Sequence, residues 1–518
     1  MNNEKNTPAS IWAEYAKGIK YNNQIELYEQ VKKNENFYIG KQWEGLNAPD
    51  LIKPVVNVIK RVVSYFISMI VSDDVGVNLN PFIETNENRH HAQILSNAVD
   101  EVIEFADIKS KSREIIRDAA VDGDGFLYCY FDPEAETGQD AKGRIFAEVL
   151  SNVNVMYGNP YSSDLQKQPY VIIAFRKAIE AVKEEAKNNN NVIENLTEDG
   201  DSNQYEVSGG SQDGLVTVIL KLWKENGTVR AIKTTKNAII RDAWDTGLKL
   251  YPIAHMRWNP IKNSYHGMAA VTEAIPNQIS INQLFAMAIH SVKSTAFPKV
   301  IFDRTKIQGW SNKVGQAIGV VGNPNEAIYS GFRAPDMSAQ VMDLIERLTQ
   351  KTLEFMGASD AALGNIKPDN TSAIIATQKA AAMPLELQRL EFYRFTEEYI
   401  RVILDNIAVY YGLRQASFKE DGNTVVIPFD YSIFDTASFS LNIDIGSAAY
   451  WSELMQIQTL DNLFSKQIIP DAITYLENIP DNYLRGKGKI IEEIKKRQEE
   501  AAMQQQMQQP PMPNGGMM

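Results

Sequence analysis

The sequence predicts an α+β fold, because helix-type and strand-type periodicity occur in separate blocks of the chain. Apolar residues three or four positions apart mark long helices near residues 276–295, 336–357 and 372–411. Short apolar runs bounded by Gly, Pro and Asn gather at 126–258 and again at 299–330. With 518 residues, 44% hydrophobic and 23% charged, the chain has the composition of a folded protein of several domains.

The N-terminal half predicts helices first and a mixed region of strands after them. Apolar stripes indicate helices at 11–38, 55–71, 94–108, 111–120 and 178–187. Alternating apolar and aromatic residues indicate strands at 126–131, 145–150, 153–157, 170–176, 215–223, 229–234 and 252–258. Residues 1–10 are polar, so we expect no secretion signal, and the polar residues 188–191 and 198–211 predict a mobile surface loop.

Two helical segments of similar length flank a Gly-rich, strand-prone insertion. Pro276 suits the start of the first helix, or a kink if residues 268–274 are also helical, and Pro298 cannot extend it. The second helix is expected to begin at Asp336 or Ser338 and to end at Gly357. Matched lengths predict that the two helices lie side by side. The insertion predicts short strands at 299–303, 317–321 and 327–330, a pattern that an ordinary α+β enzyme with an inserted hairpin would share.

The C-terminal third predicts one long helix, a β cluster and further helices. Residues 371–373 cap a helix that reaches residue 411, and Pro384 removes one of its hydrogen bonds and so predicts a kink. Residues 424–428, 431–434 and 438–445 predict the β cluster, and 449–464, 471–478 and 490–503 predict helices. The Gln-, Met-, Pro- and Gly-rich residues from 503 onward predict a disordered tail.

Composition and motifs give no catalytic constellation. The five histidines show no metal-ligand spacing, His90 and His91 lie in a polar stretch that predicts solvation, and the single cysteine, Cys129, predicts a buried small side chain. No phosphate-binding loop or nucleophile elbow is present, and a turn explains Asp122 and Asp124 more simply than a nuclease pair does. We therefore expect no enzymatic activity, no metal and no cofactor. Residues 55–71 are too short and too interrupted by charge to span a membrane.

The order of these segments resembles the portal proteins of tailed bacteriophages. The resemblance is carried by helix, small β module and helix, by the loop ALGNIKPDNTSA at 362–373, and by the proline-kinked helix after it. YIGKQW at 38–43, PVVNVI at 54–59 and DGDGF at 122–126 agree with the N-terminal region of that family. The resemblance implies a portal fold: a mixed α/β wing, a two-helix stem, a small β-containing clip, a long kinked helix and a mostly helical crown.

Carried over by position, the resemblance divides the chain into the parts of a portal. These are an N-terminal wing (1–267), stem helices (268–297 and 336–357), a clip (298–335), a tunnel loop (358–371), a kinked wing helix (372–412), a β cluster and crown (413–502) and a disordered tail (503–518). The resemblance also implies a homo-oligomeric ring, expected to be a dodecamer, at one vertex of the virion capsid. Double-stranded DNA would pass through it during packaging and ejection.

The implied partners are the terminase large subunit, the major capsid and scaffold proteins and a head–tail adaptor, with assembly in the host cytoplasm and no membrane. Asn365, Lys367 and Asn370 match the tunnel loop near the DNA, and Pro384 marks a hinge in the helix that follows. Basic clip residues expected to face terminase are Lys299, Arg304, Lys306 and Lys313, although solvated charges at loop edges explain them equally well. The formal charge of −13 suits a channel that does not trap phosphates, and it suits simple solubility equally. Another neck or connector component, or an uncharacterised soluble enzyme, remains as an alternative reading.

Overall fold

The computed structural model describes most of the chain and divides it into two compact units. The described residues are 6–47, 52–71, 75–81, 85–191, 214–296, 299–307, 309–311, 317–326, 329–332, 339–358, 383–420, 423–434, 439–445, 450–466, and shorter pieces at 193–198 and 468–497. The larger unit comprises Met1–Val71 and Val77–Ile443, and the smaller comprises Ser72–Gly76 and Asp444–Met518. Helices and antiparallel strands are both abundant, which confirms the α+β class.

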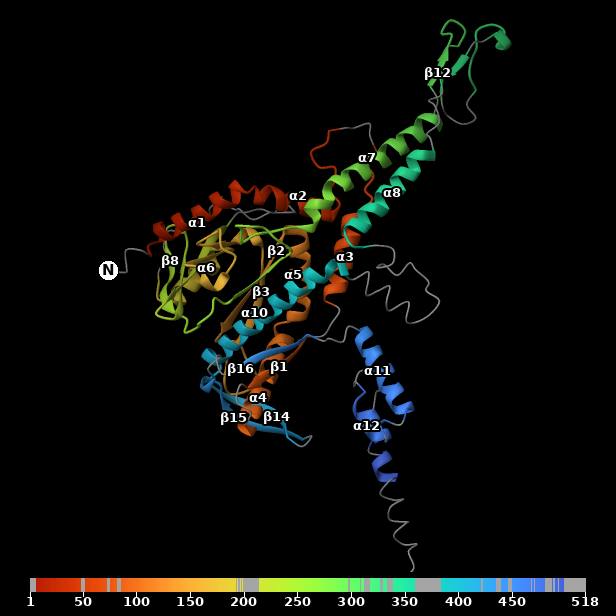
Figure 1. Cartoon of the computed structure of the whole chain (residues 1–518). Helices are drawn as coiled ribbons and strands as arrows, with labels where there is room; N and C mark the ends of the chain where they lie inside the picture. Colours follow the sequence, from red (N-terminus) through yellow and green to blue (C-terminus); the bar gives the residue numbers. More distant parts are fainter. Residues whose placement is uncertain are drawn as a thin grey trace, which may run out of the picture. The chain divides into compact units, whose positions relative to one another are not determined.

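The larger unit contains a five-stranded antiparallel sheet with one helix on each face (Figure 1). Its strands, in spatial order, are β4 (Val155–Tyr157), β5 (Tyr170–Ala178), β6 (Leu215–Glu225), β7 (Thr228–Thr234) and β8 (Ile239–Asp245). Ile219 of β6 packs on Ile11 and Tyr15 of helix α1 (Pro8–Gln24). The neighbouring residue Val218 points to the opposite face and packs on helix α6 (Ile179–Asn188).

A three-stranded sheet lies between the five-stranded sheet and a helical core. Its order is β3 (Arg144–Leu150), β2 (Asp124–Asp132) and β9 (Ile253–Arg257). Phe126 of β2 packs toward the core of the five-stranded sheet, whereas Leu127 and Cys129 pack toward the helices. Burial raises the pKa of the Cys129 thiol to about 12, although Lys111 opposes the shift, so the thiol stays protonated. The prediction of a buried small side chain at Cys129 is confirmed.

The helical core gathers seven long helices around one apolar cluster. They are α2 (Leu27–Ile39), α3 (Val58–Ile70), α4 (Asn86–Phe105), α5 (Ile108–Asp122), α7 (Ala270–Ala296), α8 (Ala339–Phe355) and α10 (Glu386–Tyr410). Helix α10 runs along the three-stranded sheet and buries Phe395, Tyr399 and Ile403 completely or nearly so. Their spacing of four residues places them on one face, as the apolar stripe of this segment predicts.

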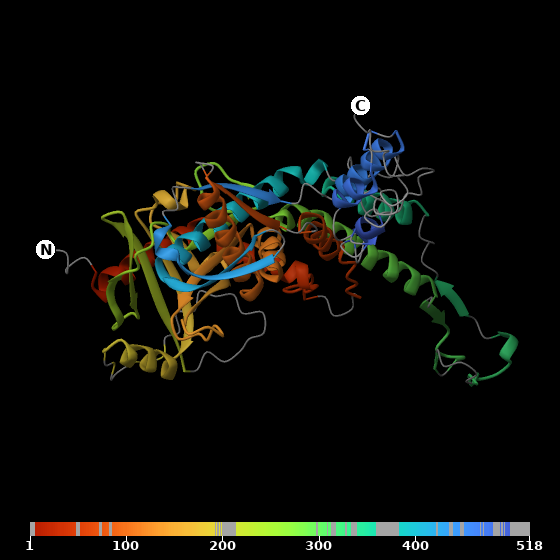
Figure 2. The same ribbon diagram turned by 90° about the horizontal axis from the view of Figure 1, so that it is seen from below.

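Helices α7 and α8 pack side by side and carry a small sheet at the end away from the other strands (Figures 1 and 2). The small sheet pairs β12 (Lys299–Phe302) with β13 (Tyr329–Phe332). Helix α7 begins at Ala270 and contains Pro276, so the alternative in which the helix starts before Pro276 is observed for residues 270–274, whereas Met268 belongs to β11 (Gly267–Met268). Gly357 ends the second helix region with a φ of 74°, as predicted for a left-handed helix end.

Shorter elements complete the described chain. They are β1 (Val75–Pro81) paired with β16 (Phe439–Ile445), β10 (Asn259–Pro260) with β11 (Gly267–Met268), β14 (Leu413–Glu420) with β15 (Asn423–Asp430), the 3-10 turns η1 (Asn152–Asn154), η2 (Leu165–Lys167), η3 (Pro324–Glu326), η4 (Met383–Leu385) and η5 (Tyr431–Ile433), and, in the smaller unit, α11 (Tyr450–Ser465) and α12 (Ala472–Glu477). The side chain of Gln139 covers the free edge of strand β14. Its amide oxygen accepts a hydrogen bond from the backbone N–H of Gln415 at 3.0 Å, and its amide nitrogen donates to the carbonyl oxygen of Gln415 at 3.4 Å.

Several predictions of local structure are wrong, each for a physical reason. Instead of the expected strand at 317–321, the structure has a single β-bridge between Val320 and Ile307, because this Gly-rich segment does not pair with a neighbouring strand over a longer stretch. Residues 431–434 form the 3-10 turn η5 rather than a strand, because Asp430 accepts the backbone N–H of Ser432 and turns the chain. The helix expected at 11–38 breaks before Leu27, where Glu26 adopts a φ of 55°.

His90 and His91 are half-buried against aromatic rings, which corrects their expected solvation. The ring of His90 lies 5.0 Å from that of Phe418, and the ring of His91 lies 5.3 Å from that of Phe429. These contacts join α4 to the β14–β15 hairpin, and sequence reasoning missed them because β14 itself was not predicted. The predicted disordered tail and most of the predicted mobile loop at 188–211 lie outside the described residues.

Candidate functional site

Helix α7 is anchored in the larger unit by a buried network of side-chain amides. Gln278 accepts the backbone N–H of Val58 at 3.0 Å and donates to the carbonyl oxygen of Val56 at 2.7 Å. Asn282, one turn further, donates to the Gln42 side chain at 2.6 Å and accepts from Gln278 at 3.0 Å. The network satisfies the backbone of the extended segment before α3, which has no strand to pair with.

The network brings together two of the N-terminal sequence motifs, YIGKQW and PVVNVI. The Trp43 indole donates to the carbonyl oxygen of Pro54 at 2.8 Å, and Asn57 donates to that of Tyr38 at 2.9 Å. Asn57 also caps helix α3 by accepting the backbone N–H of Lys60 at 3.0 Å. The two motifs therefore form one structure that holds the side of α7.

A second anchor fixes the first turn of α7 to helices α2 and α5. The Thr272 hydroxyl accepts from Asn34 at 2.9 Å and from Gln30 at 3.2 Å, both on α2. Asn34 also donates to the carbonyl oxygen of Val121 in α5 at 2.7 Å. One buried asparagine thus connects three helices.

Asp124 ties the chain that leads into α7 to the start of β2. Its carboxylate lies 3.1 Å from a ring nitrogen of His255 and 2.7 Å from one of His266, and it accepts the backbone N–H of Gly267 at 2.8 Å. All of these side chains are buried. Burial alone would raise the pKa of Asp124, but attraction to His266 and hydrogen bonds from both histidines lower it to about 2. Burial lowers the pKa of His255, and Asp124 only partly opposes this.

Close backbone packing accompanies this contact. Gly123, with a φ of 99°, ends α5 and faces Gly267 directly. A Cβ atom at Gly267 would lie 2.6 Å from the carbonyl oxygen of Gly123, so a side chain does not fit without movement of the backbone. The pair of Asp122 and Asp124 is therefore a helix exit and a structural clamp.

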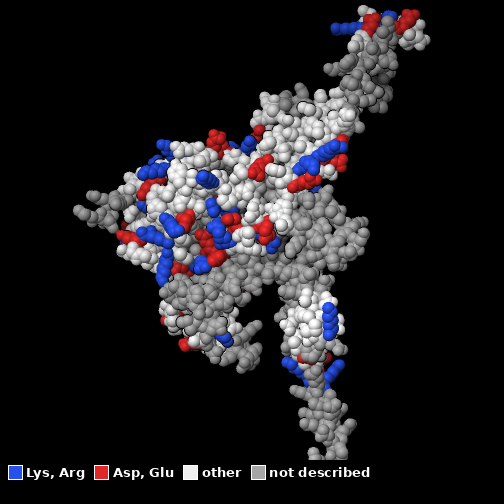
Figure 3. Space-filling view, in the orientation of Figure 1, with Lys and Arg blue, Asp and Glu red and all other residues white. Residues whose placement is uncertain are grey.

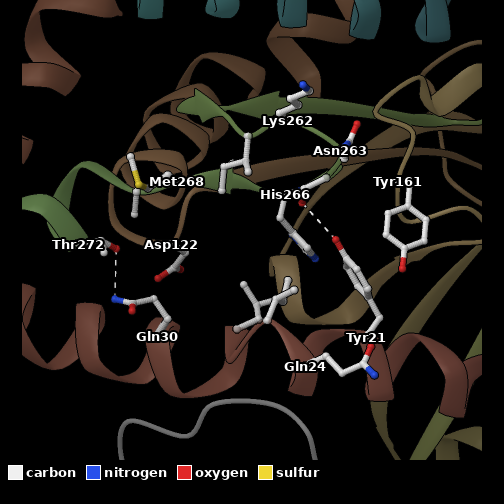
Figure 4. Close-up of a pocket in the computed structure, with 16 residues that line it drawn as sticks. Tyr21, Gln24, Gln30, Asp122, Tyr161, Lys262, Asn263, His266, Met268 and Thr272 are labelled. Carbon is white, nitrogen blue, oxygen red and sulfur yellow. Dashed lines mark hydrogen bonds between the residues drawn. The ribbon is translucent and has the colours of Figure 1, made fainter.

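A pocket of about 440 Å³ opens beside this clamp, between the α1–α2 junction and the β10–β11 turn (Figure 4). Asp122, Gln30 and Thr272 lie together at one end, and Tyr21, Tyr161 and His266 lie at the other. Burial and the neighbouring Asp118 raise the pKa of Asp122 well above its ordinary value. Asp122 Oδ1 is buried without a hydrogen-bond partner. This oxygen can therefore form one hydrogen bond with an incoming polar group.

Beyond its anchored half, the helix pair exposes large apolar side chains. Val292 on α7 is 59% exposed, and Met342 and Leu344 on α8 are 48% and 52% exposed. In Figure 3 uncharged side chains dominate this surface, apart from one strip that contains both signs of charge. Helix α8 carries the exposed ion pairs Asp343–Arg347 and Lys351–Glu354. An apolar surface of this kind marks a protein–protein contact.

The sequence was compared with known protein families. Residues 18–418 match the model of the family described as Phage P22-like portal protein, which covers most of the chain. The chain belongs to this family. A comparison with curated proteins finds no match.

Family membership shows that this is a tailed-phage portal protein, a structural component of the virion that connects head and tail. Portal proteins of this family form oligomeric rings at the portal vertex and interact with capsid and terminase in general. Among the described residues, no helix combines the length and apolar character needed to cross a membrane.

Of the four basic residues expected in the clip, the structure describes the side chains of Arg304 and Lys306. Lys299 lies in β12, Arg304 is exposed in the following turn, and Lys313 lies outside the described residues. Lys306 donates to the carbonyl oxygen of Glu326 at 3.0 Å and so closes the turn internally. Asp303 organises the same turn by accepting the backbone N–H of Thr305 at 2.9 Å. The described geometry gives Lys306 a structural role beside any role in docking.

Asn365, Lys367 and Asn370, which are expected in the tunnel loop, lie outside the described residues, but the chain at 339–358 and from 383 onward is described. Ala358 and Leu385 are both buried in the helical core. A Cβ atom at Gly357 would lie 2.9 Å from the Cβ of Pro384, so the two ends meet. Pro384 itself sits in the 3-10 turn η4, and the described helix α10 begins two residues later. The described residues on either side of this segment are therefore neighbours in the core.

Sequence reasoning missed the buried polar clamps of α7. Asp124, His255 and His266 are far apart in the chain and meet only because β2, β9 and the β10–β11 turn are adjacent. Among the described residues, no three His, Cys, Asp or Glu side chains are arranged to hold a metal ion. Gln278 and Asn282 could have been found from the sequence, because they are two amide side chains on the otherwise apolar buried face of one helix.

Proposed function

We propose that this chain assembles into a dodecameric ring whose channel carries double-stranded DNA into the capsid during packaging and out of it during ejection. The observation that carries the proposal is the α7–α8 pair, which is firmly anchored at one end and exposes apolar side chains along the other. Side-by-side copies would cover these side chains, and a head-to-tail contact repeated around a closed ring satisfies every copy equally.

In this proposal the portal parts follow the boundaries given by position. Residues 268–297 and 336–357 form the stem, 298–335 the clip, 358–371 the tunnel loop, 372–412 the kinked wing helix and 413–502 the β cluster and crown. The wing (1–267) would meet the major capsid and scaffold proteins during assembly in the host cytoplasm. The clip would dock the terminase large subunit first and the head–tail adaptor later, with Lys299, Arg304, Lys306 and Lys313 available for that contact.

Lys367, repeated around the ring, would form a weak electrostatic collar for DNA, with Asn365 and Asn370 as further donors. A Lys367→Ala variant tests this part: rings should form normally, whereas DNA packaging with the phage's terminase should become less efficient. Normal packaging by Lys367→Ala rings across a range of salt concentrations would remove the collar from the proposal.

Pro384 would act as the hinge through which the loop adjusts to passing DNA, because it packs on Gly357 at the other end of the predicted loop. Pro384→Ala restores the missing N–H and should stiffen the start of α10. We expect Pro384→Ala rings to assemble and to package DNA more slowly. Wild-type packaging rates would count against the hinge.

A further inference from the structure

The pocket between the α1–α2 junction and the β10–β11 turn presents hydrogen-bond acceptors at one end. Asp122 Oδ1 is buried there and has no hydrogen-bond partner in the part of the chain that the structure describes. Figure 4 shows the carboxyl group beside Gln30 and Thr272. Gln30 uses both N–H groups of its amide, on Asn34 at 2.7 Å and on Thr272 at 3.2 Å, so its oxygen is the group that remains for a ligand. This end is suited to a ligand that donates hydrogen bonds.

The charges around Asp122 favour a positively charged donor. Burial is the main cause that raises the pKa of Asp122, and the charges of Asp118, Glu35 and Asp124 raise it further. Arg117 opposes these charges, but its guanidinium is already paired with Glu35 and Asp118. A bound cation would stabilise the ionised carboxylate in this surrounding, whereas a neutral donor would not relieve the repulsion between the carboxylates.

The opposite end of the pocket is aromatic. Tyr21 and Tyr161 lie there with ring centroids 6.2 Å apart and ring planes at 78°, and Tyr161 is 69% exposed (Figure 4). Two rings at nearly a right angle form a corner that suits a second cation, because the face of an aromatic ring attracts positive charge. In Figure 4 the side chain of Lys262, the one lysine that lines the pocket, extends away from both rings and from Asp122.

Apolar side chains also line the pocket. Ile25, which lies in the chain between Tyr21 and Gln30, lines it together with Ile261 and Met268. Ile25 and Ile261 are 41% and 45% exposed, so a hydrocarbon chain bound here would cover apolar surface. The volume of about 440 Å³ lies within the range of small-molecule sites. The pocket therefore combines an acidic end, an aromatic end and apolar walls.

We infer that this pocket binds an aliphatic polyamine, with one ammonium group on the Asp122 carboxylate, a second against the rings of Tyr21 and Tyr161, and the methylene chain on the apolar side chains. Both amines would be charged at neutral pH, since the pKa of an alkylammonium such as that of lysine is about 10.4. Every group that this site uses belongs to one chain. The inference therefore goes beyond the proposed function and does not depend on ring formation.

Isothermal titration of the purified full chain with spermidine tests the site. Physiological salt with added magnesium suppresses diffuse binding of a polycation to an acidic surface. We expect saturable binding of one spermidine per chain. Butanediol, which has a hydrocarbon chain with polar ends but carries no charge, should neither bind nor displace spermidine.

Variants at the two ends of the pocket locate the bound molecule. Asp122→Asn keeps the size of the side chain but removes its charge, and it should weaken spermidine binding by about tenfold or more. Tyr161→Ala removes one ring and should weaken it by about two- to fivefold, whereas Tyr161→Phe keeps the ring face and should bind as the wild type does. The matched control is Glu114→Gln, an exposed carboxylate on the same helix as Asp122 and outside the pocket lining, which should leave the affinity unchanged.

Three results would overturn the inference: absence of saturable binding, displacement of spermidine by butanediol, or an equal change of affinity in Asp122→Asn and Glu114→Gln. Circular dichroism shows whether Asp122→Asn is folded. Tyr161→Ala changes an exposed side chain and so tests the site even if Asp122→Asn does not fold, and an unchanged affinity in Tyr161→Ala would also overturn the inference. Absence of rings in mass photometry would overturn the proposed function alone.

Discussion

The two halves of helix α7 differ in how their apolar side chains are buried. From Ala270 to Ala288 the helix buries apolar and amide side chains, and its polar groups are bonded within the same chain. Beyond Ala288 it exposes the large apolar side chain of Val292 and leads toward the short sheet of β12 and β13. The first half is packed within one chain, whereas we propose that other copies cover the second half. Substitutions should therefore act on folding in the first half and on assembly in the second.

The largest loss of stability is expected on substitution of Asp124, which ties the chain leading into α7 to the start of β2. Asp124→Asn removes the charge that holds two histidines and a backbone N–H, and it places an amide N–H₂ where an acceptor is needed. Local stability should fall by about 3–5 kcal/mol, the range for a buried charged contact that loses one partner. Hydrogen exchange should show lost protection at residues 267–275. Unchanged protection there would contradict the role of Asp124 as a clamp.

A somewhat smaller loss of stability is expected on substitution of Gln278 in the network of side-chain amides. Gln278→Ala removes one hydrogen bond from the carbonyl oxygen of Val56 and one from the backbone N–H of Val58, which keep only the 2.8 Å hydrogen bond to each other, and it opens a cavity, at a cost of about 2–4 kcal/mol. The matched control is Gln283→Ala, on the same helix but exposed, which should change little. Hydrogen exchange at residues 56–62 should separate the two variants, and equal protection in both would contradict the anchoring account.

Glu398 provides a pH-dependent test of the same region. Burial raises the pKa of Glu398 to about 7, although the backbone N–H of His255 and Arg394 oppose the shift. Because its ordinary pKa is 4.5, the folded chain retains a proton that the unfolded chain has lost, so this contribution to stability is present below pH 4.5 and is lost as pH rises through 7. Glu398→Gln keeps the acceptor oxygen and should stabilise the chain by about 1–3 kcal/mol at pH 8, with little difference at pH 5. Thermal unfolding at the two pH values measures this, and an equal gain at both would exclude ionisation as the cause.

The smallest effect on folding is expected in the distal half of the helix pair. Leu344→Asp and Val292→Asp place charge on exposed positions, so each should change the stability of the single chain by less than about 0.5 kcal/mol. Thermal unfolding of the unassembled chain checks this. A loss of several kcal/mol would mean that these side chains are already covered within one chain.

The sequence predicts an element of this structure well when the residues that determine it are neighbours in the chain. The stripe of α3, the pairing-competent runs of β5 to β7 and the left-handed end at Gly357 follow from neighbouring residues, and they were predicted. Strands β8 and β14 were not, because β8 is an exposed edge strand with a single fully buried residue, Ile240, and β14 alternates weakly with many polar side chains. The clamp at Asp124 depends on contacts across more than a hundred residues, which periodicity does not encode. The portal family was identified from the order of segments, a signal that survives when no single motif is decisive.

The most direct test of the central claim is mass photometry of the purified chain, beside the double variant Val292→Asp/Leu344→Asp, with negative-stain electron microscopy of both samples. The account predicts wild-type rings with a central hole and a mass near twelve chains, whereas the variant stays folded and runs mainly as single chains. Wild-type protein that remains a monomer at high concentration and across salt would contradict the ring. A variant that forms normal rings would show that the exposed surface of α7 and α8 is not where the copies meet.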